Sequence, residues 1–430
     1  MSFWEKDLET MSRADLEKLQ VERLNKTLEQ AAKSPFYSKT LKGKKISKIE
    51  DIRDLPFTTK NDLRNNFPYG FLSVDQKEVV RLHSSSGTTG NPTVIFHTKH
   101  DLNSWANLMA RCLYAAGVRD TDVFQNMSGY GLFTGGLGFQ YGIEHLGCLS
   151  IPAGAGNSLR QIKLMQDYGT TVGHAIPSYL KRLYDVFLEC GLDPKKDTKL
   201  HTLVIGAEPH TDEQRRRIEE MFGVKAYNSF GLSEMNGPGV AFECTYQDGM
   251  HVWEDAYIVE IVDPETMQPV PDGEYGELVM TTLDRVAMPL IRYRTRDLTR
   301  FIVGECKCGR THRRLDRISG RSDDMFIVKG CNIFPMQVEG ILMKFKEISS
   351  NYLITLDTKS DNDVMIVEVE LNGDEFVGDI NFLANLNQKI TNELRDEILI
   401  KPVVKLVQPG TIPAAEGKAV RVVDKRVATK

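Results

Sequence analysis

Short apolar runs alternate with longer amphipathic segments between residues 99 and 229. The short runs are typical of buried strands, and apolar residues repeated every three or four positions are typical of helices. Strands that alternate with such helices favour a mostly parallel sheet covered on both faces. The pattern predicts helices over 99–116, 136–146, 158–168, 178–190 and 212–222, and strands over 123–127, 149–151, 171–175, 202–205 and 224–229.

The segment before this region is less regular. Apolar residues spaced among charges predict an amphipathic helix over 12–32, with Ser12 as its N-cap and Asp15 three positions further on. Residues 37–80 show no clear pattern, and a strand is predicted over 94–97.

After residue 243 the pattern changes. Apolar and polar residues alternate in Tyr257–Val262, Glu277–Thr282 and Leu298–Val303, between turns rich in Pro, Gly and Asp. Alternation of this kind predicts antiparallel strands or a small barrel. We therefore expect a β-rich subdomain over about 243–320.

Beyond Arg321 the pattern is that of a small α+β unit. It predicts helices near 335–345 and over 380–398, and strands near 352–356, 364–371 and 403–407. The stretch GRSDD at 320–324 separates the two patterns. The expected fold class is α/β: a large N-terminal domain (1–320) with doubly wound sheets and the β-rich subdomain, and a small mobile α+β C-terminal domain (321–430).

Composition narrows the class of protein. Hydrophobic content of 41% and charged content of 26% are ordinary for a globular chain, and a net charge of −5 argues against a general nucleic-acid binder. Charges stand near the N-terminus where a signal peptide needs an apolar core, and no run of about 18 apolar residues occurs. We therefore expect a cytoplasmic protein that binds neither nucleic acid nor membrane. Seven cysteines in 430 residues predict thiols or metal ligands and no disulfide framework.

The stretch SSSGTTGNPT at 84–93 combines glycines with small hydroxyl side chains. Glycine lets backbone N–H groups turn toward one point, and hydroxyls add donors without blocking an anion. This chemistry suits a polyphosphate, although Asn91 follows the second glycine where a G-x-x-x-x-G-K-[ST] loop has Lys. Composition alone favours an ordinary exposed loop. Only the stretches that follow it in the chain favour a phosphate-binding loop instead.

Six further stretches follow the loop in a fixed order: GAEP (206–209), NSFGLSE (228–234), GEL (276–278), YRTRD (293–297), GRSDD (320–324) and GTIPAAEGKAVR (410–421). Together they resemble the adenylate-forming superfamily of acyl- and aryl-CoA synthetases. The resemblance is nearest to its phenylacetate–CoA ligase branch, through FYSKTL (36–41), FTT-K-DLR (57–64), GYGLFTGGLG (129–138) and DDMFIVKGCNIFPMQVE (323–339). It covers nearly the whole chain, and motifs in this order are far more specific than any one of them.

The resemblance implies that a carboxylate is joined to the α-phosphate of ATP with release of pyrophosphate, and that the CoA thiol then displaces AMP. The small-molecule partners would be ATP, CoA and an aryl acid, first of all phenylacetate. The residues that it assigns to ATP binding are Ser84, Ser85, Gly87, Thr88, Thr89, Gly90, Ala207, Glu208, Pro209, Asn228, Phe230, Gly231, Asp297 and Arg321.

Three carboxylates carry specific roles in this resemblance. Glu234 would hold Mg²⁺ beside Ser233 at the α-phosphate, and Asp297 would accept both ribose hydroxyls. Glu208 would border the adenine. The alternatives are that Glu208 is a helix-entry residue and that Asp297 is a surface partner of Arg294 or Arg296.

The C-terminal part supplies the remaining catalytic assignments by resemblance. Lys418, in the closing stretch, would stabilise charge between the carboxylate and the α-phosphate. Asp323 would be the hinge about which the C-terminal domain rotates between the two half-reactions. Val328, Lys329 and Gly330 would then line the CoA channel. The alternative is an ordinary Asp-rich linker and a solvated Lys.

The acyl group is expected near residues 129–143. By family position Tyr130, Gly131, Phe133 and Phe139 would shape a pocket for a flat aryl ring. The alternative is that about half of the aromatic residues here are core residues under a helix.

A metal site is predicted from four soft ligands. Cys244 and His251 flank a turn, Cys306 and Cys308 lie in a second loop, and this composition is typical of structural Zn²⁺. His312 would be the substitute if His251 were not a ligand. The alternative is four unrelated residues, two of them surface thiols.

Two other functions stay open. One is an adenylating enzyme that passes another aryl acid to a carrier protein, and the other is a non-catalytic nucleotide-binding relative. A homodimer is also left open by the sequence.

Overall fold

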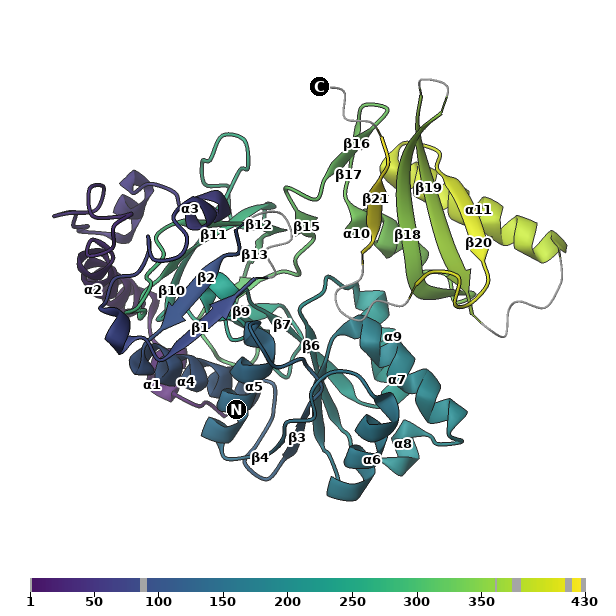
Figure 1. Ribbon diagram of the computed structural model, residues 1–430, viewed down its shortest axis with the longest axis horizontal. Helices are drawn as coiled ribbons and strands as arrows, with labels where there is room; N and C mark the ends of the chain where they lie inside the picture. The colour runs from purple at the N-terminus through teal and green to yellow at the C-terminus, as the bar shows by residue number, and fades with distance from the viewer. Residues whose placement is uncertain (1, 86–90, 360–361, 373–379, 414–419, 427–430) are drawn as a thin grey trace.

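The central sheet is built from strands that are apolar on both faces. The computed structural model describes residues 2–85, 91–359, 362–372, 380–413 and 420–426. Every residue of β6 (Thr202–Gly206) is buried, with Leu203 and Ile205 in one core cluster and Val204 in another. A strand with two apolar faces needs helices on both sides, and the sheet has them (Figure 1).

The parallel half of this nine-stranded sheet matches the predicted alternation of strands and helices. Its strand order is β7-β6-β5-β3-β4. The largest shift of a boundary is in α5, which begins at Thr134 instead of residue 136. The elements are β3 (Val123–Asn126), β4 (Leu149–Ile151), β5 (Val172–Ala175) and β7 (Lys225–Phe230), with α4 (Lys99–Ala115), α5 (Thr134–Leu146), α6 (Ser158–Tyr168), α7 (Pro177–Glu189), α8 (Pro194–Asp197) and α9 (Asp212–Phe222).

The β-rich stretch is shared between two sheets. Four of its strands continue the central sheet in antiparallel fashion, in the order β13-β14-β9-β8, and four others form a separate sheet in the order β10-β11-β12-β15. The strands are β8 (Ala241–Glu243), β9 (Met250–Val252), β10 (Tyr257–Val262), β11 (Gly276–Thr282), β12 (Tyr293–Thr299), β13 (Phe301–Ile302), β14 (Arg314–Leu315) and β15 (Gly320–Arg321).

The predicted strand Leu298–Val303 is wrong. β12 ends at Thr299 and pairs with β11 and β15, whereas β13 begins at Phe301 and pairs with β14 in the central sheet. The chain crosses from one sheet to the other at Arg300. No Gly, Pro, Asn or Asp stands between Leu298 and Val303, so the sequence carries no turn signal at the crossing.

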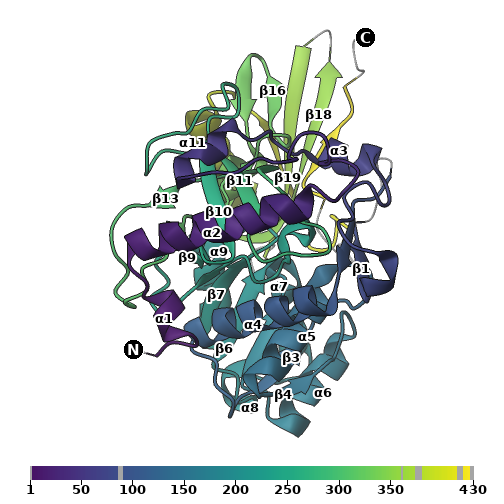
Figure 2. The same ribbon diagram turned by 90° about the vertical axis from the view of Figure 1, so that its left-hand side faces the viewer.

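The N-terminal helix packs on this second sheet (Figure 2). The hydroxyl of Ser12 accepts a hydrogen bond from the backbone N–H of Asp15, so the predicted N-cap is confirmed. Thr27 donates to the carbonyl of Leu283 at 3.1 Å, next to the end of β11. The elements of this part are α1 (Lys6–Glu9), α2 (Arg13–Ala31), η1 (Ile49–Asp54), α3 (Lys60–Asn65), η2 (Gln76–Glu78), β1 (Arg81–Ser84), β2 (Val94–His97) and η3 (Ser233–Met235).

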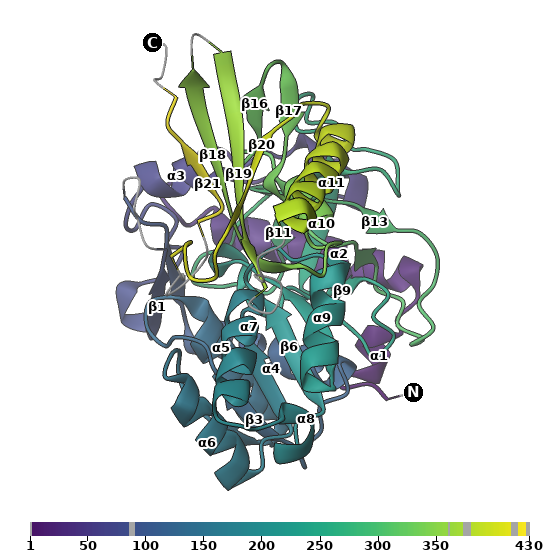
Figure 3. The same cartoon turned by 90° about the vertical axis from the view of Figure 1, so that its right-hand side faces the viewer.

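Residues after 325 form a unit with its own core (Figure 3). Its sheet has the order β20-β19-β18-β21, and one face of α11 packs against it through Leu386, Ile390 and Leu394. The elements are β16 (Phe326–Val328), β17 (Cys331–Ile333), α10 (Pro335–Leu342), β18 (Ile348–Lys359), β19 (Asn362–Leu371), α11 (Ile380–Ile398), β20 (Val403–Val407) and β21 (Val422–Asp424).

The predicted fold class is confirmed: a mixed α/β chain with a large N-terminal part, several sheets and a smaller α+β part at the C-terminus. Across the described ranges, no helix combines the length and the apolar character that a bilayer-spanning segment requires.

Candidate active site

The ends of the glycine-rich loop are held by an antiparallel hairpin. Ser84 pairs with Val94 across β1 and β2. Beyond the hairpin, the N–H of Ser85 donates to the carbonyl of Thr93 at 3.0 Å, and the N–H of Thr93 donates to the Ser85 hydroxyl at 3.0 Å. The remaining residues predicted for the loop, Gly87, Thr88, Thr89 and Gly90, lie outside the described residues.

Glu234 contacts the root of this loop, which Ser85 and Thr93 form. It lies in η3, is buried, and accepts a hydrogen bond from the Thr93 hydroxyl at 3.3 Å. Its backbone carbonyl accepts from the guanidinium of Arg285. The hydroxyl of neighbouring Ser233 lies 3.3 Å from that of Thr134 at the start of α5. Glu234 is therefore brought to the root of the loop, and Ser233 to the start of α5.

Asp297 lies in the same buried region. A guanidinium nitrogen of Arg321 donates to Asp297 Oδ1 at 3.2 Å, and Arg321 also binds both oxygens of Asp323 at 2.9 and 3.0 Å. The pKa of Asp297 is raised to about 6: burial raises it most and the charges of Glu234 and Asp323 add to the rise, while Arg321 and the Thr295 hydroxyl oppose it. The structure thus brings together two predicted ATP-binding residues, the predicted hinge residue and the predicted magnesium ligand.

The alternative for Asp297 as a surface partner of neighbouring arginines is wrong. Asp297 is only 9% exposed. Arg294 and Arg296 both pair with Glu277 on the neighbouring strand β11, whereas Asp297 pairs with Arg321.

The remaining predicted nucleotide residues follow the ends of two neighbouring parallel strands. β6 and β7 pair in register up to Gly206 and Ser229, so the stretches 207–209 and 230–231 leave the same edge of the sheet. Ligands of open α/β sheets bind at this edge. Ala207 has a positive φ of 65°, Phe230 is half-buried, and a Cβ on Gly231 would lie 2.6 Å from the Cα of Gly237.

Glu208 and Asn228 have structural partners at this edge. The Glu208 carboxylate accepts from the N–H of Ser178 at 3.1 Å and from its hydroxyl at 2.9 Å, in the first turn of α7. This contact supports the alternative that Glu208 is a helix-entry residue. The helix is α7, however, and not α9, which follows Glu208 in the chain. The N–H of Asn228 donates to Glu243 at 2.8 Å. Pro209 is exposed.

The predicted acyl-pocket residues are divided between surface and core. Tyr130 is 37% exposed, and its hydroxyl donates to Gln140 at 2.8 Å. Phe133 is 58% exposed at the N-cap of α5, whereas Phe139 is buried and stacked on His174 at 3.7 Å. Gly131 has a φ of 152°. The segment lies beside the loop root, because the carbonyl of Leu132 accepts from the N–H of Ser84.

The predicted CoA-channel residues form the tip of a hairpin. Lys329 and Gly330, with φ values of 50° and 80°, make the two-residue turn between β16 and β17, and both are exposed. Two positive φ values are typical of a type I′ turn. Val328 is buried in the C-terminal core. Lys418 lies outside the described residues.

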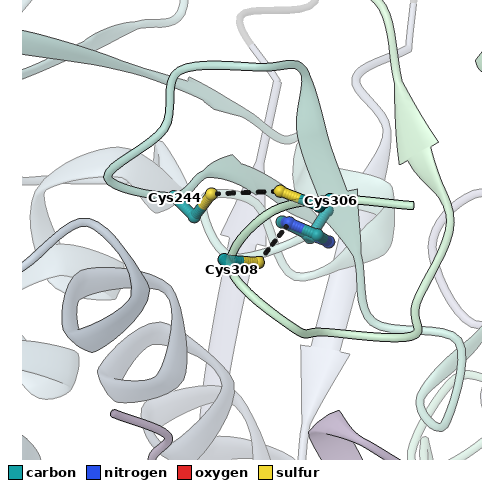
Figure 4. A group of neighbouring side chains, drawn as sticks. Cys244, Cys306 and Cys308 are labelled. Atoms are coloured by element: carbon teal, nitrogen blue, oxygen red, sulfur yellow. Dashed lines mark hydrogen bonds between the residues drawn. The ribbon is translucent and has the colours of Figure 1, made fainter. Parts of the chain in front are cut away.

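A second cluster lies apart from these residues, in the β-rich part (Figure 4). The ligand atoms of the buried residues Cys244, His251, Cys306 and Cys308 all lie within 4.8 Å of one another. Hydrogen bonds with Cys244, Cys306 and His251 lower the pKa of the Cys308 thiol. The alternative of four unrelated residues, two of them surface thiols, is therefore wrong, and the set fits a tetrahedral Zn²⁺ site.

His251 provides the imidazole of the cluster, and the substitute proposed for it does not. His251 Nδ1 lies 3.2 Å from the His312 carbonyl, which leaves Nε2 facing Cys308 Sγ at 3.2 Å. His312 uses both of its own ring nitrogens, one toward the N–H of Glu254 and one toward the carbonyl of Leu8.

Comparison with protein families covers most of the chain. A family model described as AMP-binding enzyme matches residues 13–283, and one described as AMP-binding enzyme C-terminal domain matches residues 330–426. The chain belongs to the family of AMP-binding enzymes. The predicted resemblance to adenylate-forming enzymes is confirmed, and with it the predicted class of ATP-dependent acid–CoA ligase that acts through an acyl-adenylate.

Known relatives of this AMP-binding enzyme match over nearly their full length. A phenylacetate–coenzyme A ligase of Pseudomonas putida is 44% identical over 429 residues, which are 98% of this chain and 97% of the relative. One of Thermus thermophilus is 41% identical over 443 residues, which are 98% of this chain and 99% of the relative. The predicted likeness to the phenylacetate–CoA ligase branch is thereby confirmed.

Solved structures of one ligase in two states resemble the chain to different degrees. 2-Hydroxyisobutyryl-CoA ligase in the postadenylation state, in complex with R3-HIB-AMP, has a TM-score of 0.90 at 28% identity, covering 98% of this chain and 92% of that one. The same ligase in the thioesterification state, with 2-HIB-AMP and CoA, has a TM-score of 0.73 at 30% identity, covering 99% and 92%. ATP, CoA and an acid are the substrates that this family implies.

Three residues of the enzyme's site were not predicted from the sequence. Thr93 and Thr134 touch Glu234 and Ser233, and both stand inside stretches that the motifs already marked, at the end of the loop and in GYGLFTGGLG. Arg285 stands outside every motif, and its contact with the Glu234 carbonyl has no signal in the sequence.

Proposed function

We propose that the acid which this enzyme ligates to CoA is an aryl acid, and that phenylacetate is preferred. The relatives that are 41–44% identical over nearly the full length support this choice, since they are phenylacetate–coenzyme A ligases. The exposed rings of Tyr130 and Phe133 beside the loop root support it as well, because a flat apolar ring is favoured by aromatic contacts.

The observation that carries the ATP-dependent step of the proposed function is the convergence of charged groups at the loop root. Glu234 contacts Thr93, which closes the glycine-rich loop, and its charge acts on Asp297, which is bound by Arg321. In the proposed function the loop and Ser233 hold the phosphates and Asp297 accepts the ribose hydroxyls. Lys418 supplies the cation that stabilises the charge developing between the carboxylate and the α-phosphate.

Magnesium fits this donor set. A hard cation prefers oxygen ligands, and the Glu234 carboxylate with the neighbouring Thr93 hydroxyl offers them at the loop that would hold the phosphates. When bound, Mg²⁺ neutralises phosphate charge. The protein's share is to keep Glu234 fixed through the contact between its backbone carbonyl and Arg285.

The proposal is tested by AMP formation from a panel of aryl and alkyl acids, with ATP and with or without CoA. We expect phenylacetate to give the highest kcat/KM and a CoA thioester as product. Preference for an alkyl acid would overturn the substrate proposal. Adenylate formation without any CoA thioester would favour the carrier-protein alternative, and absence of pyrophosphate release with every acid would favour the non-catalytic one.

The cysteine and histidine cluster is proposed as a structural zinc site. Four protein ligands leave no open position, which is typical of structural rather than catalytic zinc. The contact between His251 Nδ1 and the His312 carbonyl orients the ring so that Nε2 can bind the metal. Elemental analysis of reduced, chelator-free protein should give one zinc per chain, and a metal-free but fully folded protein would refute the site.

The division into residues 1–320 and 321–430, with Asp323 as the hinge, is also a proposal. The separate core after residue 325 and the exposed position of Asp323 support it. Asp323→Pro should stall thioester formation and largely retain adenylation, because proline fixes φ at the residue that has to turn. Unchanged coupling of the two steps would exclude the hinge.

A further inference from the structure

One arginine of the N-terminal part reaches across to the C-terminal unit. Arg217 lies on α9, which sits directly below the sheet of that unit in Figure 1. One terminal nitrogen of its guanidinium, Nη2, donates to the carbonyls of Met343 at 2.6 Å and Phe345 at 2.7 Å. The other, Nη1, donates to the carbonyl of Ile348 at 3.3 Å. Three carbonyls of one connection thus converge on a single side chain.

The chemistry of these acceptors explains why an arginine stands there. Met343 is the C-cap of α10, and the last carbonyls of a helix lack partners within it and carry partial negative charge. A guanidinium offers several donors in a rigid plane, so it can satisfy more than one carbonyl at once. Burial lowers the pKa of Arg217, and the nearby carboxylates of Glu213 and Glu347 oppose that shift, so the side chain stays charged.

This contact belongs to one orientation of the C-terminal unit. The connection from Met343 to Ile348 has to lie over α9 for all three hydrogen bonds to form. The two structures of 2-hydroxyisobutyryl-CoA ligase are states of one enzyme, so the difference between their TM-scores of 0.90 and 0.73 reflects how its parts are arranged. The orientation that Arg217 contacts is therefore closer to the postadenylation state, in which that ligase holds an acyl-adenylate, than to the thioesterification state, and we assign it to the adenylating half-reaction.

We propose that Arg217 is a positioning residue for the first half-reaction: it holds the C-terminal unit in the orientation for acyl-adenylate formation and has to release it before thioester formation. The proposal rests on the proposed function, in which that unit carries Lys418 to the acid and ATP. Arg217 itself touches no substrate, and its effect is on the population of the adenylating orientation.

The test separates the two half-reactions. Arg217→Met should slow pyrophosphate release from phenylacetate and ATP by at least about tenfold, since hydrogen bonds from a charged group are lost. Conversion of supplied phenylacetyl-adenylate and CoA to thioester should be unchanged or faster. Arg217→Lys, which keeps the charge with fewer aligned donors, should recover part of the first rate. Arg216→Met is the matched control, because Arg216 is exposed and pairs with Glu213 within the same helix.

Each outcome decides the proposal. Equal slowing of both half-reactions, or no slowing of the first, overturns the role of Arg217. Unfolding of Arg217→Met is checked by its melting temperature, and small-angle scattering then provides a second measurement in which a wider spread of domain orientations is expected. An unchanged scattering profile together with a slowed first step also overturns the proposal. Failure of the unmodified enzyme to release pyrophosphate would instead be a failure of the proposed function.

Discussion

The nucleotide site and the cysteine–histidine cluster are both buried groups of reactive side chains, but they are built in opposite ways. In the cluster all four ligand atoms lie within 4.8 Å of one another, and all four residues are buried. In the nucleotide site, Glu234 and Asp297 place two like charges in one buried region, and the Asp297 pKa rises to about 6 as burial and these charges oppose ionisation.

Unsatisfied groups mark the same contrast. Arg285, beside the carbonyl of Glu234, has two buried nitrogens that find no hydrogen-bond partner within the described part of the chain. Both ring nitrogens of His251 in the cluster have a partner, the His312 carbonyl and Cys308 Sγ. A cluster whose four protein ligands leave no open position is suited to hold a structural metal, whereas a site that is left charged and has unpartnered polar groups is suited to bind a substrate and act on it. The contrast predicts which substitutions affect catalysis and which affect stability.

The largest effect is expected from Lys418→Ala. Removal of a group that stabilises developing charge commonly lowers the rate by about 10²–10³. Pyrophosphate release from phenylacetate and ATP should fall by that factor, while thioester formation from supplied acyl-adenylate should be kept. Equal loss of both steps would show that Lys418 acts elsewhere.

Glu234→Gln should lower adenylation by a similar factor of about 10²–10³ without loss of stability. The change keeps the volume of the side chain and removes the charge that would bind magnesium. The measurement is pyrophosphate release against magnesium concentration, with the melting temperature recorded beside it. Glu220→Gln, an exposed change on α9, serves as the control. A large fall in melting temperature would show that Glu234 stabilises the fold, as the cysteine–histidine cluster is proposed to do.

Cys308→Ser should have the opposite effect: a loss of stability without a loss of catalysis. Loss of a structural metal belongs to the large destabilising changes, on the order of 4 kcal/mol in the free energy of unfolding. The protein that remains folded should keep its kcat. The measurements are thermal unfolding, zinc content and activity per folded molecule, with the exposed Cys190→Ser as a control that changes none of them. A stable, zinc-free, fully active Cys308→Ser protein would end the structural interpretation.

The smallest effect is a pH dependence from Asp297, whose pKa is raised to about 6. Only the ionised carboxylate accepts both ribose hydroxyls, and its ionised fraction falls about tenfold from pH 7 to pH 5, so KM for ATP should rise by about that factor. Because the folded state holds this proton more tightly than the unfolded chain, the same protonation adds stability as the pH falls through 6. The loss is therefore in ATP binding and not in folding.

Two variants isolate this pH dependence. In Asp297→Asn, any change of KM with pH that remains comes from the ionisation of ATP itself. The effect of Asp297 is the difference between the KM of this variant and that of the unmodified enzyme at each pH. Arg321→Met should move the rise in KM to a higher pH, because the charge of Arg321 opposes the rise in the Asp297 pKa. A difference that stays flat between pH 7 and pH 5 would contradict the assigned role of Asp297.

Much of the fold follows from local pattern alone. The helices and strands predicted between residues 99 and 229 lie where the apolar periodicity places them, because most of these strands are buried and each of these helices buries one face. The short helix α8 was not predicted. The pattern fails at Arg300, where the chain changes sheets without any turn residue to mark the change. Which strand pairs with which is a property of distant segments, and a local pattern does not contain it.

For the site, the sequence by itself determined the ordered motifs and therefore the family, because residue types and their order along the chain can be recognised without knowing any distance in space. It also named the four possible zinc ligands. Only the tertiary structure decided that Cys244 and Cys306, 62 positions apart, face each other, that His251 and not His312 joins them, and that Arg217 meets α10. Contacts between distant segments arise from packing of the whole chain, and so the side chains that complete and orient a site are the part that sequence leaves undetermined.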